Sequence, residues 1–349
     1  MADMKTEARA QVSTNSEPFY KFKWIPSSAE LLEAAEKRIL RYVKTRYEGR
    51  FVPCNTGQSR LWTLMFNSKH PSRMPFVFVH GFGAGVGLWA QNIDPLCQQR
   101  PFCAFDLLGF GRSSRTKFSK SAVLAEQQFV ESMEQWRNQL KLDKMILVGH
   151  SFGGYLVSSY AMKYPDHVQH LVLVDPWGFP EKPDNFESRF PVWVRAIGTV
   201  IMTVTGTILS VVRTAGPYGP DLIKKGRPDL QGKFSELFDD DTITNYIYHC
   251  NAQDPSGEKA FKTLMSSWGF AKRPMIHRIH EVRQDIPITF IYGAKTYSII
   301  DSSMGRKTQE IRQGSYVKVH MIENAGHHVY ADQPKQFNDL LKQTCEDIP

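Results

Sequence analysis

The segment Gly149-His150-Ser151-Phe152-Gly153 has the residue types and spacing of a nucleophilic site, because it spells G-x-S-x-G directly after the apolar run 145–148. A strand that ends in so small a turn can hold a serine in a strained backbone conformation with its Oγ exposed. Glycines leave room there for the neighbouring strand and for the following helix. A chance serine in a glycine-rich turn is the alternative, so the motif counts only in its context. On that condition, the sequence predicts Ser151 as a nucleophile.

A second segment with catalytic potential is the loop from His80 to Gly85, which follows an apolar strand predicted at 76–79. The pair of segments resembles the α/β hydrolases, in which this loop and the residue after the nucleophile each supply one oxyanion donor. We therefore expect the backbone N–H groups of Phe82 and Phe152 to form the oxyanion hole. A dinucleotide-binding loop is disfavoured, because no G-x-G-x-x-G is followed by a helix and a ribose-binding acid.

A general base is expected after the last strand of such a sheet. The sequence predicts that strand at 316–322, and it leads within four residues to Gly326-His327. We expect His327 to be the base because it directly follows the glycine in a turn of small residues. Its neighbour His328 is the alternative.

Two aspartates compete for the role of orienting that histidine. Asp301 follows the strand predicted at 288–293, and the order serine, aspartate, histidine is the one that the fold requires. We assign this role to Asp301, although it lies eight residues beyond Gly293. Asp175, directly after the strand predicted at 171–174, remains the competitor.

The fold class expected is α/β: an α/β-hydrolase fold with a mostly parallel sheet, helices on both faces and an inserted cap. A chain of 349 residues with 42% hydrophobic residues can bury one large catalytic core plus an insertion. The predicted divisions are a disordered tail at 1–26, the first part of the core at 27–174, the cap at 175–285 and the second part of the core at 286–349.

Longer motifs make the resemblance more specific. The stretches HGFGAGVGLW, FDLLGFGRSS, GHSFGG, DPWGFP, DDTITNYIYHCNAQDPSGEKAFK and AGHHVYADQP resemble the α/β-hydrolase-domain 4/5 subfamily from about Trp24 to the C-terminus. One branch of that subfamily is a lysophospholipase acting on N-acyl phosphatidylethanolamine and its lyso form. The other is a lipid-droplet co-activator of triglyceride lipase, and many of its members have lost the serine. This chain keeps Ser151, whereas Lys295 and Gly326 resemble positions with which the co-activator branch engages its lipase.

The segment from His327 to Asp332 also matches H-x-x-x-x-D, which in this family is interpreted as a lysophosphatidic acid acyltransferase motif. Because His327 is already assigned to the serine, we interpret this match as a coincidence. Acyl transfer remains an alternative outcome, since a lipid hydroxyl can capture an acyl-Ser151 intermediate in a dry pocket.

Two segments have the composition of lipid-contacting structure. The run 196–212 has no charged residue, and we expect it to line an acyl-chain tunnel or to dip into a lipid monolayer; an ordinary buried cap helix and a transmembrane helix are the alternatives. Near the N-terminus, Phe19, Tyr20, Phe22 and Trp24 alternate with lysines, as in an interfacial anchor. The alternative for this arm is packing on the surface of the protein itself.

Composition narrows the class of partner and the compartment. The net charge of +8 fits anionic lipid head groups better than nucleic acid, because no nucleic-acid-binding module is present. Five cysteines without paired or metal-ligand spacing indicate reduced thiols in the cytosol, and no cofactor or metal is expected. We therefore predict a cytoplasmic serine hydrolase of lipid esters, peripheral on lipid droplets or on mitochondrial or endoplasmic reticulum membranes, with a glycerophospholipid substrate and a triglyceride lipase as candidate partner.

Overall fold

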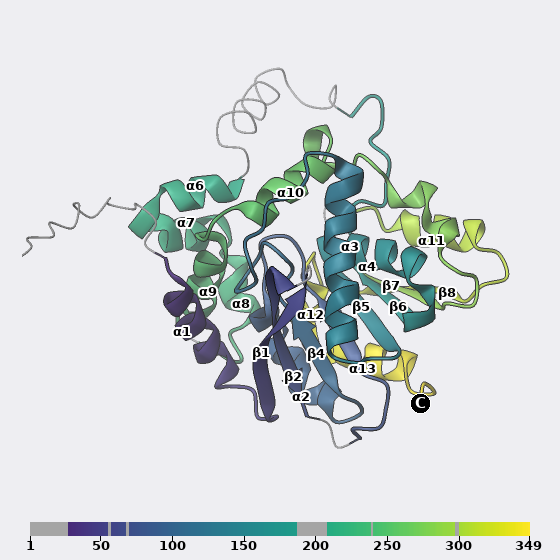
Figure 1. Cartoon of the computed structure of the whole chain (residues 1–349), viewed down its shortest axis with the longest axis horizontal. Coiled ribbons are helices and arrows are strands. Elements are labelled where there is room, and N and C mark those ends of the chain that lie inside the picture. Colours follow the sequence, from purple (N-terminus) through teal and green to yellow (C-terminus); the bar gives the residue numbers. More distant parts are fainter. Residues whose placement is uncertain (1–26, 55–56, 68–69, 187–207, 239, 297–299) are drawn as a thin grey trace, which may run out of the picture.

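The protein, a computed structural model, is described at residues 27–54, 57–67, 70–186, 208–238, 240–296 and 300–349. In these residues eight strands form one sheet in the order β1-β2-β4-β3-β5-β6-β7-β8 (Figure 1). The strands are β1 (Tyr47–Cys54), β2 (Ser59–Phe66), β3 (Phe76–Val79), β4 (Phe102–Phe105), β5 (Met145–His150), β6 (Val168–Val174), β7 (Ile288–Gly293) and β8 (Val317–Ile322). The pairs β1–β2 and β2–β4 are antiparallel, and all the others are parallel. The predicted mostly parallel sheet is confirmed.

Helices cover both faces of this sheet, as predicted. They are α1 (Ala29–Leu40), α2 (Ala90–Cys97), α3 (Ala122–Gln139), α4 (Phe152–Lys163), α6 (Ile208–Thr214), α7 (Gly219–Gly226), α8 (Asp229–Lys233), α9 (Thr242–Asn251), α10 (Ser256–Leu264), α11 (Ser303–Ile311), α12 (Val329–Asp332) and α13 (Pro334–Thr344). Figure 1 shows α3 crossing one face of the sheet and α6, α7, α9 and α10 gathered at one end of it.

Alternation along the central strands builds two hydrophobic cores. Successive strand residues point to opposite faces, so Met145 and Leu147 of β5 pack in one core while Ile146 and Val148 pack in the other. The first core includes α3 and α4, and the second includes α2 and α13. Because both faces are buried, these strands are apolar throughout, which is why they are recognisable as continuous apolar runs in the sequence.

The first described helix, α1, is capped by Ser28. Ser28 has an extended backbone, and its Oγ accepts a hydrogen bond from the Leu31 N–H at 3.2 Å. Such a cap satisfies one of the N–H groups that have no partner within the first turn. Leu32 and Ile39 on the same helix are buried, as their spacing predicts, and they join the second core.

The chain leaves the sheet after β6 and returns at β7, and α6 to α10 lie in this interval. The domain boundaries, with the cap at 175–285, stay predictions. Residues 196–207 of the charge-free run and the aromatic residues of the N-terminal arm lie outside the described residues. Among the helices that are described, none has the length and apolar character needed to cross a membrane.

Candidate active site

The nucleophile elbow, defined as Gly149 to Gly153, joins β5 to α4. Ser151 has φ 53° and ψ −116°, a backbone conformation that an L-residue keeps only where the surroundings impose it. Its N–H donates to the Val174 carbonyl at 3.0 Å, and its own carbonyl accepts the Trp177 N–H at 3.0 Å. The serine is thus held on both sides by the end of β6 and the residues just after it.

Glycines allow the close packing that this turn needs. A Cβ on Gly153 would overlap the Val79 carbonyl and would lie 2.7 Å from the His80 carbonyl oxygen. A Cβ on Gly81 would lie 3.0 Å from the Ser151 Cβ. The loop after β3 therefore lies directly against the serine, as the sequence predicts.

Phe82 and Phe152, the predicted oxyanion donors, are brought to this region from two elements. Phe152 is the first residue of α4, where backbone N–H groups have no partner within the helix. Both side chains contact Phe261 of the cap helix α10, with ring centroids 4.4 Å away for Phe82 and 4.7 Å away for Phe152. The donor role of the two amides stays a prediction, and the cap covers both side chains.

Asp175 contacts the predicted base. Its Oδ2 lies 2.8 Å from Nδ1 of His327, and its carboxylate also accepts the Gly293 N–H at 3.2 Å and the Thr296 hydroxyl. The side chain is fully buried, and the residue has φ 44°, directly after β6. Three donors thus converge on one buried carboxylate, an arrangement that fixes the orientation of the imidazole.

The assignment of the acid to Asp301 is therefore wrong. Asp301 lies before α11, where its Oδ1 accepts the Ser303 N–H at 2.9 Å, and it lines a separate cavity of about 360 Å³ with Arg306 and Met321. Asp175, by contrast, directly follows β6 and contacts His327. The feature of the sequence that indicated Asp175 was its position directly after an apolar strand.

His327 lies in the histidine loop, defined as Glu323 to His328, between β8 and α12. Its carbonyl oxygen accepts a hydrogen bond from Nε2 of His150 at 2.9 Å, and the two rings are 4.7 Å apart. Since a carbonyl only accepts, the proton of a neutral His150 is on Nε2. Burial first, and then the neighbouring His327, lowers the pKa of His150 well below its usual value, so this ring is neutral.

His328, the alternative base, lies at the start of α12. Its carbonyl accepts the N–H groups of Ala331 and Asp332, both at 2.8 Å, and so begins α12. The residue is half-buried, and removal of its ring from solvent is the first cause that lowers its pKa well below the usual value. Of the two histidines, His327 is the one that contacts Asp175.

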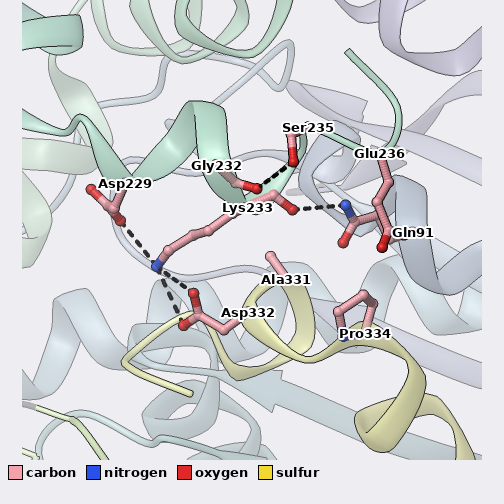
Figure 2. A pocket seen from close by; sticks show the side chains of 9 residues that line it. All are labelled: Gln91, Asp229, Gly232, Lys233, Ser235, Glu236, Ala331, Asp332 and Pro334. Atoms are coloured by element: carbon pink, nitrogen blue, oxygen red, sulfur yellow. Dashed lines mark hydrogen bonds and ion pairs between the residues drawn. The ribbon is translucent and has the colours of Figure 1, made fainter. Parts of the chain in front are cut away.

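Asp332, the last residue of the H-x-x-x-x-D match, is engaged by the backbone and by the cap. Its Oδ2 accepts the Gly326 N–H at 2.8 Å, and its Oδ1 lies 3.1 Å from Nζ of Lys233 in α8. Figure 2 shows Lys233 extended between Asp229 and Asp332 at a cavity of about 330 Å³. The carboxylate therefore joins the cap to the histidine loop, which supports the view that the acyltransferase match is coincidental.

Lys295 and Gly326, the predicted partner-binding residues, lie side by side in the loops after β7 and β8. The Lys295 N–H donates to the Ala325 carbonyl at 2.8 Å, and the lysine is exposed. A Cβ on Gly326 would meet only Oδ2 of Asp332 at 3.5 Å and the Lys295 carbonyl oxygen at 3.9 Å. A small side chain fits at position 326 without strain. The predicted membrane-binding residues Phe19, Tyr20, Phe22 and Trp24 lie outside the described residues.

Comparison with known proteins places this geometry in a family. Residues 74–200 match the family described as alpha/beta hydrolase fold. The 1-acylglycerol-3-phosphate O-acyltransferase ABHD5 of Mus musculus is 49% identical over 92% of this chain and 91% of its own length. The (lyso)-N-acylphosphatidylethanolamine lipase of Bos taurus is 50% identical over 92% of this chain and 93% of its own.

Solved structures share the fold at low identity. A bacterial membrane phospholipase A superposes with a TM-score of 0.65 at 19% identity, covering 92% of each chain. Naproxen esterase from Bacillus subtilis superposes with a TM-score of 0.63 at 16% identity, covering 90% of this chain and 97% of its own. At such identities the likeness concerns the fold alone.

Proposed function

Because the chain belongs to the α/β-hydrolase-domain 4/5 subfamily of α/β hydrolases, we propose that it is a serine hydrolase of lipid esters with Ser151, His327 and Asp175 as its catalytic residues. The observation that carries this proposal is the 2.8 Å contact between Nδ1 of His327 and Asp175, together with the strained backbone of Ser151, whose neighbour His150 bonds the His327 carbonyl. This contact assigns the proton of a neutral His327 to Nδ1. Nε2 is then the free base.

In the first half of the reaction, Ser151 Oγ attacks the acyl carbonyl carbon of the ester. Nε2 of His327 takes the hydroxyl proton and returns it to the departing alcohol oxygen, so that the ester C–O bond breaks and an acyl-serine forms. The carboxylate of Asp175 stabilises the imidazolium between these two transfers. We propose that the N–H groups of Phe82 and Phe152 stabilise the negative charge that develops on the carbonyl oxygen.

In the second half, water attacks the acyl-serine by the same route. His327 takes a proton from the water and returns it to Ser151 Oγ, which releases the fatty acid and restores the enzyme. A lipid alcohol in place of water gives acyl transfer. The acyltransferase alternative therefore differs only in the nucleophile of this half-reaction.

For the substrate, we propose a glycerophospholipid of the N-acyl phosphatidylethanolamine type or its lyso form. The lipase relatives carry that substrate in their names at 49–50% identity, and this chain has the serine that the chemistry needs. The net charge of +8 favours an anionic surface. We propose a peripheral location on droplets or intracellular membranes through Phe19, Tyr20, Phe22 and Trp24; the alanine variant at all four should lose flotation with anionic vesicles, and unchanged flotation would exclude this arm as the anchor.

The decisive experiment is hydrolysis of N-acyl lysophosphatidylethanolamine by purified wild type, Ser151→Ala and Ser158→Ala. Loss of the nucleophile should lower kcat by about 10⁴ or more and abolish fluorophosphonate labelling. Ser158 is the matched control, since its Oγ donates only to the Gly154 carbonyl of its own helix in the described structure, and its variant should stay active. Labelled Ser151→Ala would refute the assignment. Added lysophosphatidic acid tests acyl transfer: with a label in the acyl chain of the substrate, transfer would give phosphatidic acid that carries this label.

A second candidate function, co-activation of a triglyceride lipase, is favoured by the adjacency of exposed Lys295 and Gly326. We propose that this pair forms the contact with the lipase, because it combines an exposed cation with a half-buried glycine beside it that has no side chain of its own. Lys295→Ala and Gly326→Ser should then impair stimulation of the lipase on reconstituted droplets, whereas Ser151→Ala should not. Equal stimulation by wild type and Lys295→Ala would exclude this contact.

A further inference from the structure

The last turn of α9 lies between the start of α1 and the oxyanion loop, defined as residues 80–88. Its residue Asn251 is 5% exposed, and its side-chain Nδ2 donates to the Gly83 carbonyl at 2.7 Å and to the Ile247 carbonyl at 2.8 Å. Both N–H groups of this amide are therefore used. One of them reaches out of the cap to the peptide between Gly83 and Ala84, one peptide beyond the one that follows Phe82.

We propose that Asn251 is a positioning residue that holds the oxyanion loop in its working geometry, which rests on the function proposed above. An oxyanion donor contributes only if its N–H points at the place where the charge develops. The loop has glycines at positions 81, 83 and 85, and Gly83 has φ +68°, so its backbone alone permits many conformations. A side-chain bond to Gly83, one residue past Phe82, selects among them.

Two further contacts fix the same loop and complete the argument. The Tyr246 hydroxyl, one turn earlier on α9, accepts the Gly87 N–H at 3.0 Å, and Asp106 accepts the Val86 N–H at 2.8 Å. The far end of the loop is thus fastened twice. On the two sides of Phe82, Nδ1 of His80 bonds the Gly81 carbonyl at 2.8 Å and Asn251 bonds the Gly83 carbonyl, so Asn251 supplies the contact from outside the loop.

The opposite side of the same turn holds the N-terminal segment. Nε2 of Gln253 donates to Ser27 Oγ at 2.8 Å, and Nδ1 of His249 lies 3.0 Å from that oxygen. Arg213 of α6 donates to the carbonyl of Asn251 at 3.0 Å. Figure 1 shows α1, α6 and α9 close together at this side of the molecule. The turn that positions the oxyanion loop is therefore joined to α1 and to α6.

Asn251→Asp tests the contact with almost no change of shape. The carboxylate has no hydrogen to donate and places oxygen against two carbonyl oxygens, so the bond to Gly83 is lost. We expect kcat on N-acyl lysophosphatidylethanolamine to fall about tenfold or more, while KM stays within about twofold. A displaced donor stabilises the transition state less, but it changes the binding of the substrate little. Affinity for a boronic acid that forms a tetrahedral adduct with Ser151 should fall by the same factor. Asn251→Ala provides the neutral version of the test.

Asn245→Asp is the matched control, because it makes the same change on the same helix at a half-buried position. Hydrogen exchange of residues 80–88 gives a readout that does not need activity, and it should accelerate in Asn251→Asp and stay unchanged in Asn245→Asp. Unchanged exchange and unchanged inhibitor affinity in Asn251→Asp would overturn the proposal. So would an equal effect of Gln253→Leu, which removes the side-chain hydrogen bonds to Ser27, Ser28 and His249 and leaves the bond from Asn251 to Gly83 in place. Should the wild type lack hydrolase activity, the proposed function fails, while hydrogen exchange still decides whether Asn251 holds the loop.

Discussion

The nucleophile elbow and the histidine loop form one site, but different kinds of contact hold them. Backbone atoms hold the elbow: Ser151 exchanges hydrogen bonds with Val174 and Trp177, and Gly153 packs on the carbonyl groups of Val79 and His80. The histidine loop also has a backbone hydrogen bond, from Lys295 to Ala325, but side chains far apart in the sequence add to it: Asp175, His150, Asp332 and, from the cap, Lys233. A substitution that disturbs the elbow should therefore lower the stability of the whole protein. Substitutions around the histidine loop should instead lower kcat, by an amount that depends on which contact is lost.

The largest effect is expected from Gly153→Ala. The added Cβ would overlap main-chain oxygens of β3 and its loop, which cannot move without breaking the sheet, and the variant should lose several kcal/mol of stability. Urea unfolding measures this loss. Gly232→Ala in α8 is the control, since its Cβ meets nothing within 4 Å and should stabilise by about 0.5–1 kcal/mol. A fully stable Gly153→Ala would show that the elbow is not held by close packing.

Asp175→Asn should leave the fold intact and lower kcat by about 10³–10⁴, because an amide no longer favours the required tautomer or stabilises the imidazolium. Asp301→Asn should change kcat less than about threefold, since Asp301 contacts the start of α11. Steady-state kinetics of the two variants decides between them. A larger loss in Asp301→Asn would restore the assignment made from the sequence.

Asp332→Asn tests whether the cap holds the histidine loop. The amide can still accept the Gly326 N–H, but it loses the ion pair with Lys233, so we expect kcat to fall about tenfold or less. Lys233→Met should behave similarly, and the double variant should be no worse than the more impaired single one. Additive losses measured in this double-mutant cycle would mean that the two residues act separately.

The smallest effect is a pH dependence of stability from the buried histidines. Burial lowers the pKa of His150 and His328 in the folded protein, while the unfolded chain retains the ordinary value of 6.5. Below pH 6.5 the unfolded state therefore binds protons that the folded state does not, and the free energy of unfolding should fall by at most about 1.4 kcal/mol per histidine per pH unit. His150→Gln, which keeps a donor for the His327 carbonyl, should show a shallower decline between pH 6.5 and 5.5 in thermal unfolding. An unchanged slope would mean that His150 is protonated in the fold.

What the sequence determined is local. The elbow was recognisable from its pentapeptide and the apolar run before it, because a strained serine needs glycines within a few residues. The central strands, the loop after β3 and the choice of His327 depend in the same way on neighbouring residues. Each of these features could be predicted without knowing what lies across the sheet.

The tertiary structure decided which distant side chains meet. Asp175 and Asp301 both follow apolar strands in the required order, and only the pairing of β6, β7 and β8 places Asp175 at Nδ1 of His327. In the same way, Asp332 was part of a motif in the sequence but is a partner of Lys233 and Gly326 in space. Sequence periodicity specifies which face of an element is buried, yet it contains no distances between loops. Those distances follow from strand order and from the packing of the cap. They determine which aspartate contacts His327 and which atoms Asn251 contacts.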